Sequence, residues 1–158
     1  MYKEHTYQLV TEWTGNDGLG TADVKKYHRS HTVKNEGKPD LQLTTDNAAV
    51  GDKTKLNPED LLVSAISSCH LLSYLYLCSR EGVVVHAYKD HARGCMLENE
   101  LGGGSFKEVV LSPTVVVETY AMIERAEALH HAAHEICYIA NSVNFEVHIR
   151  PTVTALSI

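Results

Sequence analysis

The sequence has too few cysteines to build a disulfide framework. Only four of its 158 residues are cysteine, whereas small domains that depend on disulfides are far richer in it. Positive charge is also scarce, because 14 lysines and arginines stand against 20 aspartates and glutamates, for a net charge of −6. That balance argues against a nucleic-acid backbone or an anionic membrane surface as the main partner. We therefore expect neither nucleic acid nor membrane as a partner.

The sequence also leads us to expect neither a secretory leader nor repeats. The start, residues 1–5, is polar and is followed by no apolar stretch with a small-residue cleavage site, so we expect a cytoplasmic, reducing location. There is no internal repeat, linker or low-complexity segment. A chain of 158 residues suffices for one ordinary core and is short for two. We therefore expect a single domain over residues 1–158.

One uncharged run, the 19 residues from Leu61 to Ser79, reaches the length of a membrane span. It contains five serines, two tyrosines and a histidine, which would be costly against lipid. We interpret it as a helix buried in protein. Because the helix is apolar around most of its circumference, it needs cover on several sides, which a second subunit can supply.

Both ends of this helix carry boundary signals. Asn57 fits the N-cap, Pro58 the first helical position, and Glu59 the positive end of the helix dipole. Arg80 and Gly82 are typical of a helix C-terminus. The predicted helix therefore begins at about Pro58 and ends at about Arg80.

A second helix is predicted for residues 124–140, where apolar residues recur at three- and four-residue steps and Cys137 lies at the edge of the stripe. The remaining apolar segments are predicted as strands, with residues 102–104 as a hairpin loop. Strands before, between and after two helices indicate an α+β fold. The predicted strands cover residues 6–13, 27–33, 41–44, 83–88, 93–96, 109–117, 143–149 and 152–156.

Cys69 lies inside the first helix, directly before His70. A buried cysteine commonly acts as a small hydrophobe, whereas a reactive thiol needs a nearby cation or dipole that lowers its pKa. Consecutive helix residues point about 100° apart, so the His70 ring should face away from Cys69. From these residues alone, both interpretations remain open.

Two segments carry a cysteine each in a recognisable setting: Asn57–Leu62 followed by Ser68-Cys69-His70, and residues 134–141 around Cys137. Together they resemble the OsmC/Ohr family of thiol-dependent hydroperoxide reductases, over roughly residues 24–149. The resemblance implies an OsmC-like fold, with two long central helices packed against antiparallel sheets in an intertwined homodimer. His70 and Tyr138 depart from the Ohr branch and favour the OsmC-like branch.

The resemblance also implies a mechanism. Cys69 would attack the peroxide and become a sulfenic acid, and Cys137 would condense with it to a disulfide that an external dithiol, such as a lipoyl group, reduces. Organic hydroperoxides, and with them hydrogen peroxide, would become alcohols or water without metal, haem or flavin. An arginine and a glutamate complete the family's site; Glu59 matches the glutamate, and Arg29 is the only arginine before Arg80.

Helix geometry constrains that site. Ten residues separate Glu59 from Cys69, or about 15 Å along a continuous helix. Either the helix breaks between them, or the Glu59 beside a given Cys69 belongs to the other subunit. A pocket with an apolar lining would favour organic hydroperoxides over hydrogen peroxide; this holds if the pocket is lined by Leu61, Leu62, Ile66 and Ile139.

Other interpretations compete with the peroxidase. Cys78 and Cys95 are expected to be structural. The same pocket could serve a non-enzymatic module that binds a small apolar ligand. His130 and His134, four residues apart and close to Cys137, could instead hold a metal ion. The simpler interpretation is that they belong to a polar helix face without a metal.

Overall fold

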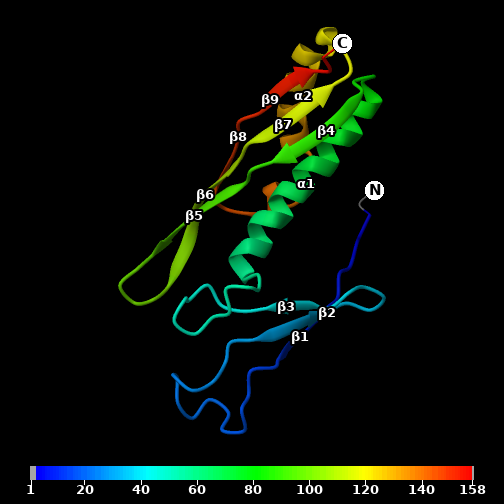
Figure 1. Cartoon of the computed structure of the whole chain (residues 1–158). Coiled ribbons are helices and arrows are strands. Elements are labelled where there is room, and N and C mark those ends of the chain that lie inside the picture. The colour runs from blue at the N-terminus through cyan, green and yellow to red at the C-terminus, as the bar shows by residue number, and fades with distance from the viewer. Residues whose placement is uncertain (1–2, 158) are drawn as a thin grey trace. The chain divides into compact units, whose positions relative to one another are not determined.

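The computed structural model describes residues 3–157 (Figure 1). The chain divides into two compact units, Met1–Leu61 and Leu62–Ile158. The α+β class expected from the sequence is confirmed, with strands before, between and after two α-helices. The single domain over 1–158 stays a prediction.

The first unit contains an antiparallel sheet of β1 (Val10–Trp13), β2 (His31–Lys34) and β3 (Leu41–Leu43). Each strand is shorter than predicted. Residues 27–30 are irregular because they fold against Gly15, where a Cβ would lie 2.0 Å from the His28 carbonyl oxygen. The indole of Trp13 donates to that same oxygen over 2.8 Å. Arg29 therefore lies in a loop rather than in a strand.

Helix α1 (Pro58–Arg80) has the predicted bounds. At its start the backbone N–H of Asp60 donates to Asn57 Oδ1 over 2.8 Å, and the N–H of Asn57 donates to the Asp60 carboxylate over 3.1 Å. This reciprocal box satisfies two N–H groups that the helix leaves without partners. At its end Gly82 has a φ of 72°, a left-handed conformation that suits glycine.

Helix α2 (Ile123–Glu135) is shorter than the predicted 124–140. Its stripe of Ala126, Leu129 and Ala133 is buried as expected. The prediction that Ile136 continues the stripe is wrong, because the helix has ended and Ile136 is 44% exposed. Cys137 thus lies just beyond α2.

The second unit contains two mixed sheets rather than purely antiparallel ones. In each, an antiparallel pair, β4–β7 or β5–β6, is extended by a parallel strand, β9 or β8. The strands are β4 (Val85–Asp90), β5 (Arg93–Glu98), β6 (Gly104–Leu111), β7 (Pro113–Val117), β8 (Glu146–Ile149) and β9 (Thr152–Ala155).

The predicted strand 109–117 is two strands, β6 and β7, because Pro113 has no N–H to donate to a ladder. At the break the Asp90 carboxylate accepts the N–H of Ser112 over 2.7 Å and the hydroxyl of Ser67 over 2.5 Å. Since Ser67 lies on α1, this carboxylate ties the helix to the strand break.

Both helices pack against the β4–β7–β9 sheet (Figure 1). The buried core there combines Tyr74 and Cys78 of α1 with Val115 and Val117 of β7. A second buried cluster forms around Ile66, Val109 and Leu111. Burial of this apolar surface holds the unit together.

Helix α1 is also long and apolar enough to cross a membrane, with a mean hydropathy of 1.6 in a window of which 22% is buried. The core helix of a soluble protein can meet the same criteria. Two of its polar side chains, Ser67 and His70, bond to Asp90 and His130, so protein rather than lipid surrounds them. We retain the interpretation of a helix packed against protein.

Candidate functional site

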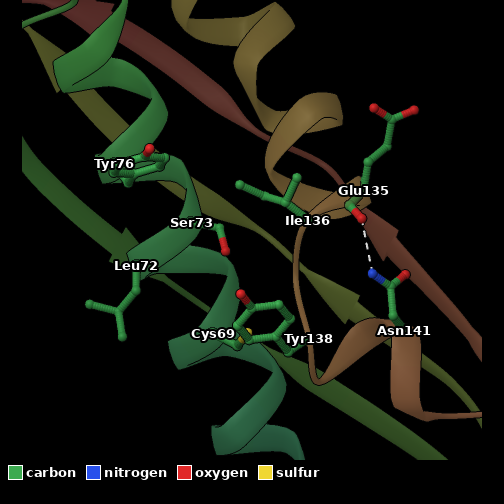
Figure 2. A pocket seen from close by; sticks show the side chains of 8 residues that line it. All are labelled: Cys69, Leu72, Ser73, Tyr76, Glu135, Ile136, Tyr138 and Asn141. Atoms are coloured by element: carbon green, nitrogen blue, oxygen red, sulfur yellow. Dashed lines mark hydrogen bonds between the residues drawn. The ribbon is translucent and has the colours of Figure 1, made fainter. Parts of the chain in front are cut away.

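A pocket of about 680 Å³ opens beside Cys69 (Figure 2). One helix face forms its first wall, because Leu72, Ser73 and Tyr76 follow Cys69 at steps of three, four and seven residues. That periodicity could have identified them from the sequence. The opposite wall is Glu135, Ile136, Tyr138 and Asn141, at and after the end of α2.

The segment after α2 places Cys137 through a compact turn. The Cys137 N–H donates to the His134 carbonyl over 3.2 Å, and the Asn141 N–H donates to the Cys137 carbonyl over 3.0 Å. The Asn141 side chain also donates to the Glu135 carbonyl over 2.9 Å, the bond drawn in Figure 2. The thiol therefore comes from a turn that several hydrogen bonds hold together.

Cys69 and Cys137 are brought together, and both are free thiols. Cys69 is half-buried at the pocket, whereas Cys137 is fully buried. Burial, opposed by the backbone N–H of Ala140 and aided by the neighbouring Cys69 thiol, raises the pKa of Cys137 to about 11. Cys137 is therefore a neutral thiol near pH 7.

The expected pocket lining is wrong. Leu62, Ile66 and Ile139 pack together in the second core cluster with Val109, and neither they nor Leu61 border the pocket. Ile66 is fully buried because it packs against Val109 and Leu111 of β6. The apolar part of the real pocket comes from Leu72, Ile136 and the tyrosine rings instead.

Arg29 and Glu59 belong to the first unit. The Arg29 guanidinium lies 3.8 Å from the Tyr27 ring centroid and donates to the carbonyls of Tyr27 and Val24 over 2.6 and 2.8 Å. Oε2 of Glu59 is buried and meets no hydrogen-bond donor within residues 3–157. The helix is unbroken from Pro58 to Arg80, so the alternative of a break between Glu59 and Cys69 is wrong. The roles of both residues stay predictions.

His70 faces away from the pocket, as the helix geometry predicts. It is 1% exposed, and its Nε2 lies 3.0 Å from Nδ1 of His130, which is 2% exposed. Burial lowers the pKa of His70 to about 4, with His134 adding to the effect, and burial also lowers the pKa of His130 to about 3. Both rings are neutral near pH 7.

This pairing corrects the interpretation of His130 as part of a polar helix face. Tyr74 stacks on the His130 ring with centroids 3.9 Å apart. Within the described residues, no three His, Cys, Asp or Glu side chains are grouped closely enough to hold a metal ion. His130 is thus a buried partner of His70 rather than a surface ligand.

The remaining cysteines lie apart from the pocket. Cys78 is 1% exposed in the core beside Tyr74, and burial raises its pKa. Cys95 is half-buried in β5. Neither lines the pocket of Cys69.

Residues 51–152 match the profile of the family described as OsmC-like protein. An OsmC-like protein of unknown function from Vibrio cholerae is 30% identical, with a TM-score of 0.84 over 94% of this chain and all of that one. An OsmC-like protein from Mycoplasma pneumoniae, 12% identical, has a TM-score of 0.72 over 96% of this chain and 99% of its own. No curated protein matches the sequence.

The fold is shared with proteins named for peroxide resistance. An organic hydroperoxide resistance protein from Elizabethkingia anophelis has a TM-score of 0.65 at 20% identity, over 98% of this chain and all of that one. At that identity the likeness concerns the fold. The pocket of Figure 2 thus lies in a fold that this chain shares with a protein named for organic hydroperoxide resistance.

Proposed function

Because this chain belongs to the OsmC family, we propose that it is a thiol-dependent peroxidase that reduces organic hydroperoxides to alcohols in the response to oxidative stress. One observation carries the proposal: Cys69 borders an open pocket, and the buried thiol of Cys137 lies beside it. An accessible thiol next to a protected one is the arrangement that a two-cysteine peroxidase needs.

In the first step the Cys69 thiolate attacks the outer oxygen of ROOH. The O–O bond breaks, Cys69 becomes a sulfenic acid, and the alkoxide takes a proton and leaves as ROH. In the second step the Cys137 sulfur attacks the Cys69 sulfur. The S–O bond breaks, and the hydroxyl leaves as water with the Cys137 proton.

The burial of Cys137 suits it to the second role. Its raised pKa keeps it protonated near pH 7, so it competes poorly with Cys69 for peroxide. It then forms the Cys69–Cys137 disulfide, which an external dithiol, for example a lipoyl-type one, reduces in two exchange steps. The cycle uses two thiols and a dithiol, with no metal, haem or flavin.

The pocket supports organic rather than hydrogen peroxide as the preferred substrate. Leu72, Ile136 and the rings of Tyr76 and Tyr138 border it, and burial of an alkyl group stabilises binding by about 0.8 kcal/mol per methylene. Hydrogen peroxide gains nothing from these contacts. We therefore expect higher kcat/KM for cumene hydroperoxide than for hydrogen peroxide.

We also propose a homodimer. Around the pocket, Leu72 is 66%, Tyr76 55% and Ile136 44% exposed, and such an apolar patch is typical of an interface. With α1 continuous, a Glu59 about 15 Å along the axis from Cys69 acts on a Cys69 of the second copy. Its Oε2, which is buried without a hydrogen-bond donor among residues 3–157, suits a guanidinium such as that of Arg29, which would favour the Cys69 thiolate.

The decisive experiment measures turnover of cumene hydroperoxide with dihydrolipoamide. Cys69→Ser is expected to reduce turnover to the protein-free background, because the attacking sulfur is lost. Cys95→Ser, at a half-buried cysteine away from the pocket, is the matched control and should keep wild-type activity. Full activity in Cys69→Ser would contradict the proposal.

Cys137→Ser tests the second step. A single peroxide equivalent should still produce one ROH and a Cys69 sulfenic acid that dimedone traps, but no intramolecular disulfide, as judged by mass spectrometry. If Cys69 in the wild-type protein does not react with peroxide at all, the alternative of a ligand-binding module is favoured instead. Fractionation of cells of the source organism tests the cytoplasmic location that we propose.

A further inference from the structure

A column of stacked polar rings joins the two helices that carry or precede the two cysteines. His70 and Tyr74 come from α1, and His130 comes from α2. The His130 ring is nearly parallel to both, at 13° to His70 and 10° to Tyr74. The proposed peroxidase chemistry uses none of the three.

The two histidines share one hydrogen bond, between His70 Nε2 and His130 Nδ1, which are 3.0 Å apart. Their outer nitrogens, His70 Nδ1 and His130 Nε2, are buried without a partner in the described part of the chain. With two neutral rings, one of these outer atoms is an N–H and the other a lone pair. A buried polar group without a partner costs about 1–3 kcal/mol, so an apolar pair would pack here at lower cost.

What a hydrogen bond adds over apolar contact is direction. It is satisfied at one distance and one angle, whereas apolar side chains tolerate sliding of one helix along the other. The pair therefore specifies the spacing and register of α1 and α2 at this level.

That level matters because each histidine is close in sequence to one cysteine. His70 directly follows Cys69, and Cys137 comes seven residues after His130, just beyond the end of α2. The turn that holds Cys137 begins on α2 at the His134 carbonyl. A shift of α2 along α1 thus moves the Cys137 sulfur relative to the Cys69 sulfur.

We propose that His70 and His130 are positioning residues for disulfide formation: their hydrogen bond holds α1 and α2 at the spacing that lets Cys137 reach the Cys69 sulfenic acid. This inference rests on the proposed function and adds to it the residues that govern its second step. Neither histidine lines the pocket beside Cys69, so the pair should leave the first step unchanged.

The test compares two variants of His130. Phenylalanine keeps an aromatic ring against Tyr74 and removes the nitrogens, whereas asparagine keeps a polar amide near the position of Nδ1. After one equivalent of cumene hydroperoxide, His130→Phe should form the dimedone-trapped Cys69 sulfenic acid at a rate within twofold of wild type. Its disulfide should form at least tenfold more slowly, and His130→Asn should form it within threefold of wild type.

The control is His131→Phe, at the neighbouring histidine on α2, whose side chain is 82% exposed; it should leave both rates unchanged. Disulfide formation at the wild-type rate in His130→Phe would overturn the inference. So would a folded His130→Asn that is as slow as His130→Phe, because the retained amide would then have rescued nothing.

Two further measurements test the inference even if a variant fails to fold or if the protein is not a peroxidase. Diamide oxidises two neighbouring thiols to a disulfide and is itself reduced to the hydrazine, so it reports cysteine positioning without peroxide chemistry; the same rate order is expected. In ¹⁵N-histidine-labelled wild-type protein, the shared ring N–H should exchange slowly with solvent in both the reduced and the disulfide form. Loss of that signal on oxidation would overturn the inference.

Discussion

The thiol of Cys137 is completely buried, whereas that of Cys69 borders the pocket and that of Cys78 lies in the core beside Tyr74. Burial raises the pKa of Cys137 and of Cys78, because a thiolate loses hydration there. The difference in proposed role between the two comes from their neighbours: Cys137 has Cys69 beside it, and Cys78 has a phenol. The surroundings of each cysteine side chain, and not the residue type, therefore decide the role that we propose for it.

The buried histidine pair predicts a loss of stability in acid. The folded-state pKa values of about 4 for His70 and about 3 for His130 lie below the ordinary 6.5, so between these values the unfolded chain binds more protons. Asp90 on β4 opposes the shift of His70, and His134 on α2 increases it. The free energy of unfolding is therefore highest above pH 6.5, and at pH 5 it is lower by about 2 kcal/mol for each of the two histidines.

Urea unfolding at pH 8 and pH 5 measures this effect. Because the His130→Asn variant has one buried histidine fewer, its loss of unfolding free energy between the two pH values should be smaller than that of wild type by about 2 kcal/mol. Equal losses in the two proteins would mean that the buried pair does not titrate as described. His131→Phe, which removes an exposed histidine, should behave as wild type.

At the scale of elements, the start of α1 depends on a few side-chain contacts. Asn57 Oδ1 accepts the Asp60 N–H over 2.8 Å, which satisfies one of the free N–H groups of the first turn. At the end of α2 the side-chain bond comes from further along the chain, where Asn141 donates to the Glu135 carbonyl over 2.9 Å, and apolar periodicity continued past the helix end into Ile136. The start of α1 was therefore predicted correctly, whereas the end of α2 was predicted too late in the sequence.

Asn57→Ala is expected to destabilise the protein by about 1 kcal/mol, because Asp60 loses its acceptor. The free energy of unfolding from urea titration at neutral pH checks this. Asn144→Ala, at an exposed position before β8, is the matched control, with an expected change below about 0.5 kcal/mol. A cost for Asn57→Ala no larger than that of the control would show that the box adds nothing.

At the scale of the whole molecule, the proposed dimer explains why α1 combines an apolar sequence with incomplete burial. Of its most apolar window 22% is buried, and Leu72 remains 66% exposed. A second copy that covers this face would bury those side chains and close the pocket over Cys69. The working unit would then be two chains of 17.5 kDa each.

Leu72→Glu tests the dimer. A carboxylate buried at the interface without a partner costs several kcal/mol, so the dissociation constant should rise at least about 100-fold. Light scattering or sedimentation at micromolar concentration should find twice the chain mass of 17.5 kDa for wild type and a single chain for the variant. Ala128→Glu, on the exposed side of α2, should remain dimeric; a monomeric wild-type protein would refute the proposal.

The sequence by itself determined the features that depend on local chemistry: the bounds of α1 from Asn57, Pro58 and Gly82, the α+β order, and the two cysteine segments of the family. These could be predicted because capping bonds, proline geometry and motif spacing act within a few residues. Only the tertiary structure decided that Cys137 lies beyond α2, that Leu72 and Tyr138 border the pocket, and that His130 is buried against His70. Those contacts join segments far apart in the sequence, 60 residues in the case of His70 and His130, and packing between them overrides local pattern.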